Sequence, residues 1–215
     1  MAKLSSRMSV NTTPEVVEAK FTPQLLIPCE ATHRGENRHH FPEYDAIMAR
    51  YGVDDVRVVK EFEKAISTAQ RVWIIDKHLF SEDGKKPVHS RRIKKVVNWF
   101  LTSQIQTIRI LTGHHDDQAE IEKEFEDLEA FVTDDRAKVD TPLKVELSFA
   151  LKDFDYIHDR FAIIDDELWH FGATVGGFHR DVNAASRGWS AETHKAVQFF
   201  DTAWKMANAN GKKTS

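Results

Sequence analysis

The stretch from Tyr156 to Thr174, YIHDRFAIIDDELWHFGAT, contains two apolar runs rich in bulky and β-branched residues. An acidic stretch at 165–167 separates the runs and suits a hairpin turn, so the pattern predicts two paired strands. In an extended strand alternate side chains share a face. His158 and Arg160 would therefore point the same way, roughly 6 to 7 Å apart along the backbone.

An imidazole and a guanidinium at this separation can contact one phosphate together. Imidazole can attack phosphorus or shuttle a proton near neutral pH, whereas arginine keeps its charge and forks onto the phosphate oxygens. The same spacing also fits an exposed polar strand face, with Arg160 paired to Asp153 or Asp155. The residues alone leave both interpretations open.

The spacing His158-x-Arg160-x4-Asp165-x6-Gly172 resembles the His-x-Lys-x4-Asp-x6-Gly-Ser signature of the phospholipase D superfamily. The resemblance covers about residues 56–207 and includes one copy of the motif. Single-motif members of that superfamily join two copies to build one site. The resemblance therefore implies a homodimer.

Three positions depart from the superfamily pattern. Arg160 replaces the usual lysine, Ala173 replaces the serine after the glycine, and Val175 stands where asparagine is common. The variant is also similar to the phospholipase D-like domains of endosomal MIT-domain proteins, which bind phosphoinositides or act as adaptors. Arginine keeps the charge but cannot donate its proton, so the departures favour phosphate binding over turnover.

The family chemistry implies that His158 attacks phosphorus, that the matching histidine of a second copy protonates the leaving oxygen, and that no metal or cofactor is required. Arg160 would stabilise the phosphoryl oxygens. Asp165 would fix local structure or orient a histidine, or would be a plain turn residue. Glu192 would hold the proton on the far nitrogen of the imidazole, or would be a cap on a solvated loop.

The segment 175–192 is rich in Gly, Ser, Asn and Arg, and it lies where an active-site loop is expected. Trp189 is the aromatic side chain expected to be exposed for stacking on a base or sugar. The predicted substrate-binding residues are Gly172, Thr174, Asn183, Ser186 and Trp189.

A basic run around the start of a predicted helix would line a phosphate-backbone groove or form a solvated face. Its members are Lys85, Lys86, Arg91, Arg92, Lys94 and Lys95. The net charge of -4 excludes a protein that coats polyanions, so any nucleic-acid contact would be local. The hypothesis of a nuclease-like phosphodiesterase thus competes with that of a catalytically silent phosphate-binding or dimerisation module.

The single cysteine, Cys29, excludes an intrachain disulfide framework and a cysteine-based zinc site, so we expect a reducing compartment, the cytoplasm. The first ten residues lack the apolar core of a signal peptide, and no apolar run approaches the length of a membrane span. His33, His39 and His40 lack the partner spacing of a metal site, so we expect no metal.

Strand-like runs and amphipathic helical patterns alternate before the hairpin. The strands are expected at 71–76, 107–113 and 143–151, and the helices at 56–69, 91–103 and 119–132. This alternation predicts an α/β fold with a mixed β-sheet flanked by helices, and the resemblance implies that it is phospholipase D-like. The segment 193–209 closes the fold as a strand and a helix or as one helix, and we favour the former.

The expected domain limits follow from these patterns. A phospholipase D-like domain would span residues 56–208 and would end in a disordered tail at 209–215. Before it, residues 1–55 would form an N-terminal extension of unknown role, with a short helix near 44–50.

Overall fold

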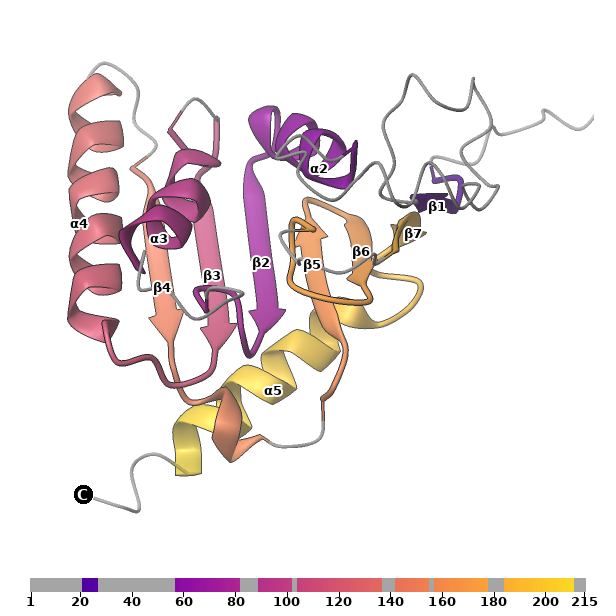
Figure 1. The fold of residues 1–215 in the computed structure, drawn as a ribbon. Coiled ribbons are helices and arrows are strands. Elements are labelled where there is room, and N and C mark those ends of the chain that lie inside the picture. Colours follow the sequence, from indigo (N-terminus) through magenta and orange to yellow (C-terminus); the bar gives the residue numbers. More distant parts are fainter. Residues whose placement is uncertain are drawn as a thin grey trace, which may run out of the picture.

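The computed structural model describes residues 21–26, 57–81, 89–101, 104–136, 142–154, 157–177 and 184–210. Within these ranges a seven-stranded sheet has the order β1-β7-β6-β5-β2-β3-β4 (Figure 1). Its strands are β1 (Gln24–Leu26), β2 (Arg71–Asp76), β3 (Thr107–Thr112), β4 (Lys144–Ser148), β5 (Arg160–Ile164), β6 (Glu167–Phe171) and β7 (Ala185–Ser190). Strands β2, β3 and β4 pair in parallel and all other neighbours are antiparallel, so the sheet is mixed.

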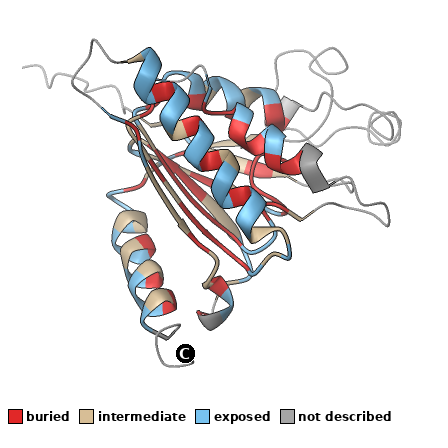
Figure 2. Ribbon diagram, turned by 90° about the vertical axis from the view of Figure 1, so that its left-hand side faces the viewer, coloured by how far each residue is buried: buried red, intermediate tan, exposed pale blue. Residues whose placement is uncertain are grey.

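Helices cover both faces of the sheet, which is seen between them in Figure 2. One face packs against α2 (Arg57–Ser67), α3 (His89–Asn98) and α4 (Gln118–Asp135), and the other against α5 (Ala196–Asn210) and the short 3-10 helix η2 (Leu151–Asp153). Helices α3 and α4 are the crossovers that parallel strands require. The predicted α/β fold is confirmed. None of the helices in the described ranges combines the length and apolar character needed to cross a membrane.

Strand β2 is buried on both faces because it lies in the middle of the sheet. Val72 and Ile74 belong to the core beneath α2, α3 and α4, and Trp73 and Ile75 belong to the core beneath α5. This explains why the four residues VWII between Arg71 and Asp76 are all apolar instead of alternating with polar residues.

The core on the α2 side is centred on Phe62, whose side chain is fully buried. Its ring meets those of Trp99, Trp169 and Phe171 edge-on, with centroid distances of 5.1, 5.3 and 5.3 Å. Such edge-to-face pairs add roughly 0.5 to 1.5 kcal/mol each to the burial of the rings. Helix α2 therefore packs against β6 and against Trp99, which directly follows α3.

The sequence interpretation is wrong at two elements. Strand β7 arises from the segment 175–192 that was expected to be a loop, because β6 and β1 supply hydrogen-bonding partners on both sides. The segment 193–209 contains no strand: turn residues 191–195 lead directly into α5, which extends to Asn210.

The sheet also includes a strand from residues 1–55, the segment that was expected to be an N-terminal extension. Strand β1 pairs with β7, so part of residues 1–55 completes the sheet. The short helix expected near 44–50 and residues 211–215 of the expected tail lie outside the described residues.

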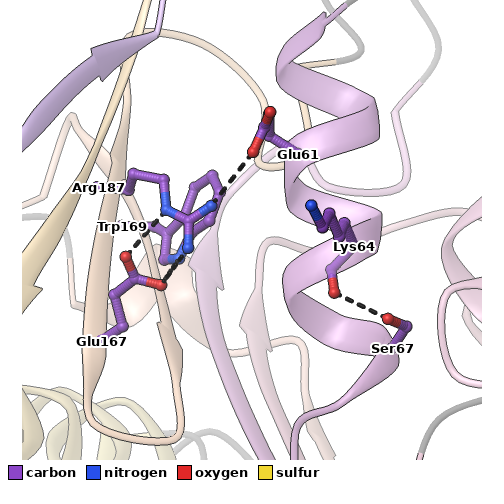
Figure 3. Close-up of polar contacts among 6 residues, drawn as sticks. All are labelled: Glu61, Lys64, Ser67, Glu167, Trp169 and Arg187. Carbon is purple, nitrogen blue, oxygen red and sulfur yellow. Dashed lines mark hydrogen bonds and ion pairs between the residues drawn. The ribbon is translucent and has the colours of Figure 1, made fainter.

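A cluster around Arg187 joins α2 to β6 and β7 (Figure 3). The Nε and Nη2 atoms of Arg187 donate to the two carboxylate oxygens of Glu167, each at 2.9 Å, and Nη1 lies 3.5 Å from Glu61. The guanidinium stacks over Trp169, 4.3 Å from the ring centroid, and the indole N–H donates to Glu167. A bidentate pair with a stacked arginine fixes the relative position of these three elements.

Candidate functional site at the carboxyl edge of the sheet

The candidate site lies where the parallel strands β2 and β3 end, at the lower edge of the sheet in Figure 1. The register pairs Ile75 with Phe161 and Arg160 with Phe171, which brings Arg160 and the end of β6 beside Asp76. Of the predicted residues, His158, Arg160, Gly172 and Thr174 therefore share this edge.

Asp76 is the buried centre of this edge, with an exposed fraction of 0%. The backbone N–H groups of Val175 and His78 donate to its two carboxylate oxygens, each at 2.8 Å. The Thr112 hydroxyl donates to its carbonyl oxygen at 2.7 Å. Burial raises the pKa of Asp76 to about 6, although both backbone hydrogen bonds and the charges of Arg160 and Arg92 oppose that rise.

Asp76 was not predicted as a site residue. The sequence showed only that a buried strand ends in a carboxylate, which is the position where open α/β sheets place their sites. That signal marks the location, but the partners of Asp76 come from segments far away in the chain.

The guanidinium of Arg160 lies beside the carboxylate of Asp76, at the same edge of the sheet. Its Nε lies 3.7 Å from Oδ1 of Asp76, and its Nη1 donates to the carbonyl oxygen of Gly172 at 3.4 Å. The side chain is only 18% exposed. The remaining nitrogen, Nη2, makes no hydrogen bond to a residue that the structure describes, so it can still donate to a ligand.

His158 lies just before β5, and its side chain is 95% exposed. Its Nδ1 lies 3.9 Å from Oδ1 of Asp159, and Oδ2 of Asp159 lies 3.5 Å from Nε2 of His170. The strand begins only at Arg160, so the expectation that His158 and Arg160 share one face of a strand is wrong. Tyr156 itself is outside the described residues.

Asp165 lies at the opposite end of β5, in the turn to β6, with φ of 51°. Its Oδ1 accepts the backbone N–H groups of Gln70 and Arg71 at 3.0 and 2.9 Å. Of the roles left open by the sequence, the structure supports a turn residue that fixes local structure. The predicted catalytic role is corrected, because the strand β5 separates Asp165 from Arg160.

Glu192 and Trp189 are also at the hairpin end. Strand β7 runs antiparallel to β6 and pairs Ala185 with Phe171 but Ser190 with Glu167, so it leads the chain away from the candidate site. Glu192 is exposed in the following turn. It therefore cannot orient His158 in the same chain, which corrects that prediction.

Trp189 is 36% exposed, as expected, and its ring lies edge-on to His194 at 5.4 Å. It lies away from His158, so stacking of a ligand on it would be separate from the candidate site.

The other predicted substrate-binding residues have different surroundings. Ser186 lies in β7, opposite His170 of β6, and Gly172 is exposed just after β6. Thr174 is only 3% exposed, and its carbonyl oxygen accepts the N–H of Gly177. Thr174 is therefore a buried turn residue instead of a ligand contact. Asn183 lies outside the described residues.

The described side chains of the predicted basic run differ in their burial. Arg92 is 7% exposed and contributes positive charge near Asp76, so it is not part of a solvent-facing groove. Lys94 and Lys95 are exposed on α3. The side chains of Lys85, Lys86 and Arg91 lie outside the described residues.

Two cavities lie away from His158 and Arg160. A polar cavity of about 520 Å³ lies beside the Arg187 cluster, between α2 and β7, and an apolar cavity of about 150 Å³ lies between α5 and the β5–β6 hairpin. Within the part of the chain that the structure describes, the candidate site is thus centred on the pair formed by the buried Asp76 and the half-buried Arg160. Among the described residues no three or more His, Cys, Asp or Glu side chains form a group suited to a metal ion.

No protein-family model matches the sequence, and no curated protein matches it. Among solved structures, the chain is similar to NucT from Helicobacter pylori, with 14% identity and a TM-score of 0.43 over 87% of this chain and 98% of NucT. It is similar to the phosphatidylserine synthase of Haemophilus influenzae Rd KW20, with 12% identity and a TM-score of 0.39 over 66% of this chain and 33% of the synthase.

A third similar structure is that of TrmBL2, an archaeal chromatin protein with a novel mode of DNA binding. The identity is 11% and the TM-score 0.36, over 88% of this chain and 55% of TrmBL2, so the chain spans about half the length of that protein. All three TM-scores are at or below 0.43, so these similarities do not assign a function to the chain.

Proposed function

We propose that the chain is a metal-independent phosphodiesterase in which His158 is the nucleophile and two copies of the chain complete one site. The observation that carries the proposal is the exposed imidazole of His158 two residues before Arg160, whose guanidinium pairs with the buried carboxylate of Asp76. The motif spacing from His158 to Gly172 supports the same chemistry.

The first step forms a bond between Nε2 of His158 and phosphorus. The ester oxygen leaves with the bonding electron pair and takes a proton from the matching histidine of the second copy. That histidine then accepts a proton from water, the water oxygen attacks phosphorus, and the phosphorus–nitrogen bond breaks. The phosphate product and both imidazoles are thereby released in their starting forms.

Arg160 supports this reaction through its remaining nitrogen. Asp76 and the Gly172 carbonyl engage Nε and Nη1, which leaves Nη2 to donate to a nonbridging phosphate oxygen. Because the guanidinium is already oriented, little side-chain entropy is lost when the ligand binds. We infer that nucleic acid is the substrate, because Lys94 and Lys95 are exposed on the helix that follows β2 and can contact further phosphates.

A specific observation favours a second function, that of a phosphate-binding module without turnover. Ala173 and Val175, which replace a serine and an asparagine of the superfamily pattern, are 5% and 0% exposed. They offer no side-chain donor to a transition state, and Arg160 is bulkier than the lysine it replaces.

Hydrolysis of bis(p-nitrophenyl) phosphate and of single- and double-stranded DNA and RNA in excess EDTA separates the two functions. If the chain is a phosphodiesterase, turnover should survive chelation and should be lost in His158→Ala. The matched control is His194→Ala, since His194 is an exposed histidine in the turn after β7, at the opposite end of the sheet. Absence of turnover, together with phosphate binding that depends on Arg160, would support the module instead.

The oligomeric state is tested separately by light scattering. A strictly monomeric protein would contradict the shared two-histidine site. A monomer with full activity would mean that the proton donor comes from the same chain.

A further inference from the structure

The carboxylate of Asp159 lies between two imidazoles at the start of β5. Its Oδ1 is 3.9 Å from Nδ1 of His158, and its Oδ2 is 3.5 Å from Nε2 of His170. Asp159 occupies the position between the two motif residues His158 and Arg160, where the superfamily pattern specifies no residue type.

His170 is the fixed member of this group because it lies within β6. Its neighbours across the sheet are Phe161 in β5 and Ser186 in β7, and its ring packs on that of Phe161 with a centroid distance of 5.2 Å. The Nε2 atom is shielded from solvent and has no hydrogen bond of good geometry to a described residue. A proton on this nitrogen is therefore best satisfied by the nearby carboxylate of Asp159.

His158 and Asp159 are the adjustable members, since their side chains are 95% and 60% exposed. The gap of 3.9 Å is longer than a hydrogen bond, but rotation of either exposed side chain can close it. Hydrogen bonds of a catalytic site are often long in the absence of substrate and shorten when it binds.

We propose, building on the function proposed above, that Asp159 is a positioning residue which holds the proton of His158 on Nδ1, and that His170 orients Asp159. With Nδ1 protonated, Nε2 carries the lone pair that attacks phosphorus. When the phosphorus–nitrogen bond forms, the ring becomes positively charged, and the adjacent carboxylate stabilises that charge without taking the proton. Asp159 thus supplies within one chain the role that Glu192 is too far away to perform.

The first test compares Asp159→Asn, Asp159→Glu and Asp135→Asn in the hydrolysis assay. We expect Asp159→Asn to lower kcat about 10- to 100-fold with little change in KM, because an amide does not stabilise the charged ring. Asp159→Glu should restore part of kcat. Asp135→Asn removes one equally negative, exposed carboxylate at the end of α4, which has returned to the opposite edge of the sheet in Figure 1, and should leave kcat unchanged.

His170 is tested by a pair of variants. His170→Gln keeps a donor that can reach Asp159 and should retain more activity than His170→Phe, which keeps the packing on Phe161 but has no donor. The pH profile of kcat should shift in Asp159→Asn and in His170→Phe, whereas a merely structural loss would lower kcat equally at every pH.

A readout that does not need turnover separates this proposal from the function on which it rests. Long-range ¹H–¹⁵N NMR of histidine-labelled protein reports which ring nitrogen of His158 carries the proton. We expect the Nδ1–H tautomer to dominate in the wild type and to decline in Asp159→Asn but not in Asp135→Asn. Unchanged tautomers in Asp159→Asn would overturn the positioning role. A tautomer shift in a protein without turnover would uphold it and refute only the phosphodiesterase.

Discussion

The buried carboxylate of Asp76 should make the stability of the protein depend on pH in an unusual direction. Burial raises the pKa of Asp76 from 3.8 to about 6 in the folded state, whereas the unfolded chain has the ordinary value. Between these two pKa values the folded protein binds more protons than the unfolded chain. The free energy of unfolding therefore falls as the pH rises through this window.

The size of the effect follows from the shift. At about 1.36 kcal/mol per pKa unit, ionised Asp76 costs the folded state about 3 kcal/mol at neutral pH relative to its protonated form. About 1.4 kcal/mol of that difference develops between pH 5 and pH 8. The ionised carboxylate is the form that pairs with the guanidinium of Arg160, 3.7 Å away.

Urea denaturation of the wild type and of Asp76→Asn at several pH values measures this contribution. The difference in unfolding free energy, wild type minus variant, should fall by about 1.4 kcal/mol from pH 5 to pH 8. Other titrating groups cancel in the difference. Asp135→Asn, at an exposed carboxylate at the end of α4, should give a difference that does not change with pH. A flat or rising difference for Asp76→Asn would show that Arg160 and the backbone hydrogen bonds outweigh burial, and would refute the reasoning.

Three further predictions concern the packing that supports the site. Phe62→Ala should lower the free energy of unfolding by about 3 to 5 kcal/mol, because it removes the central ring of the aromatic core. The control Phe131→Ala, at a ring that is 57% exposed, should change it by less than about 0.5 kcal/mol. Thermal unfolding measures both. Arg187→Met keeps the apolar stem but removes the guanidinium of the cluster in Figure 3, and should cost about 1 to 3 kcal/mol in urea denaturation; an unchanged midpoint would contradict its proposed role in joining α2 to the sheet. Gly188→Ala should detach β1 from β7, because Gly188 has φ of 82° and an added Cβ would overlap the carbonyl oxygen of Thr22; hydrogen exchange should then accelerate in β1 and remain slow in β2.

The strands and helices with strong local patterns could be predicted from the sequence. RVWIID coincides with β2 because a short Val/Ile-rich run is typical of a buried strand, and VRVVKEFEKAIS has the helical spacing that α2 shows. The hairpin of β5 and β6 and its acidic turn were also predicted, since turn residues between two apolar runs form a local signal. The spacing of His158 and Arg160 is likewise a property of adjacent residues.

Long-range pairing decided the elements that the sequence did not predict. The segment ASRGWS has weak strand propensity, yet it forms β7 because β6 and β1 lie on either side of it. For the same reason, Glu192 could not be placed by its distance from His158 along the chain. An antiparallel strand returns its residues to the opposite end of the sheet, and only the pairing of β6 with β7 reveals this.

The sequence by itself pointed to His158 and Arg160 as candidate site residues, because their types and spacing can be seen within one short segment, but it did not point to Asp159. Only the tertiary structure decided their partners. Asp76 meets Arg160 because β2 pairs with β5, and His170 meets Asp159 because β5 pairs with β6. These contacts depend on strand register, and register is set by burial of one whole strand face against the core rather than by any residue of the site.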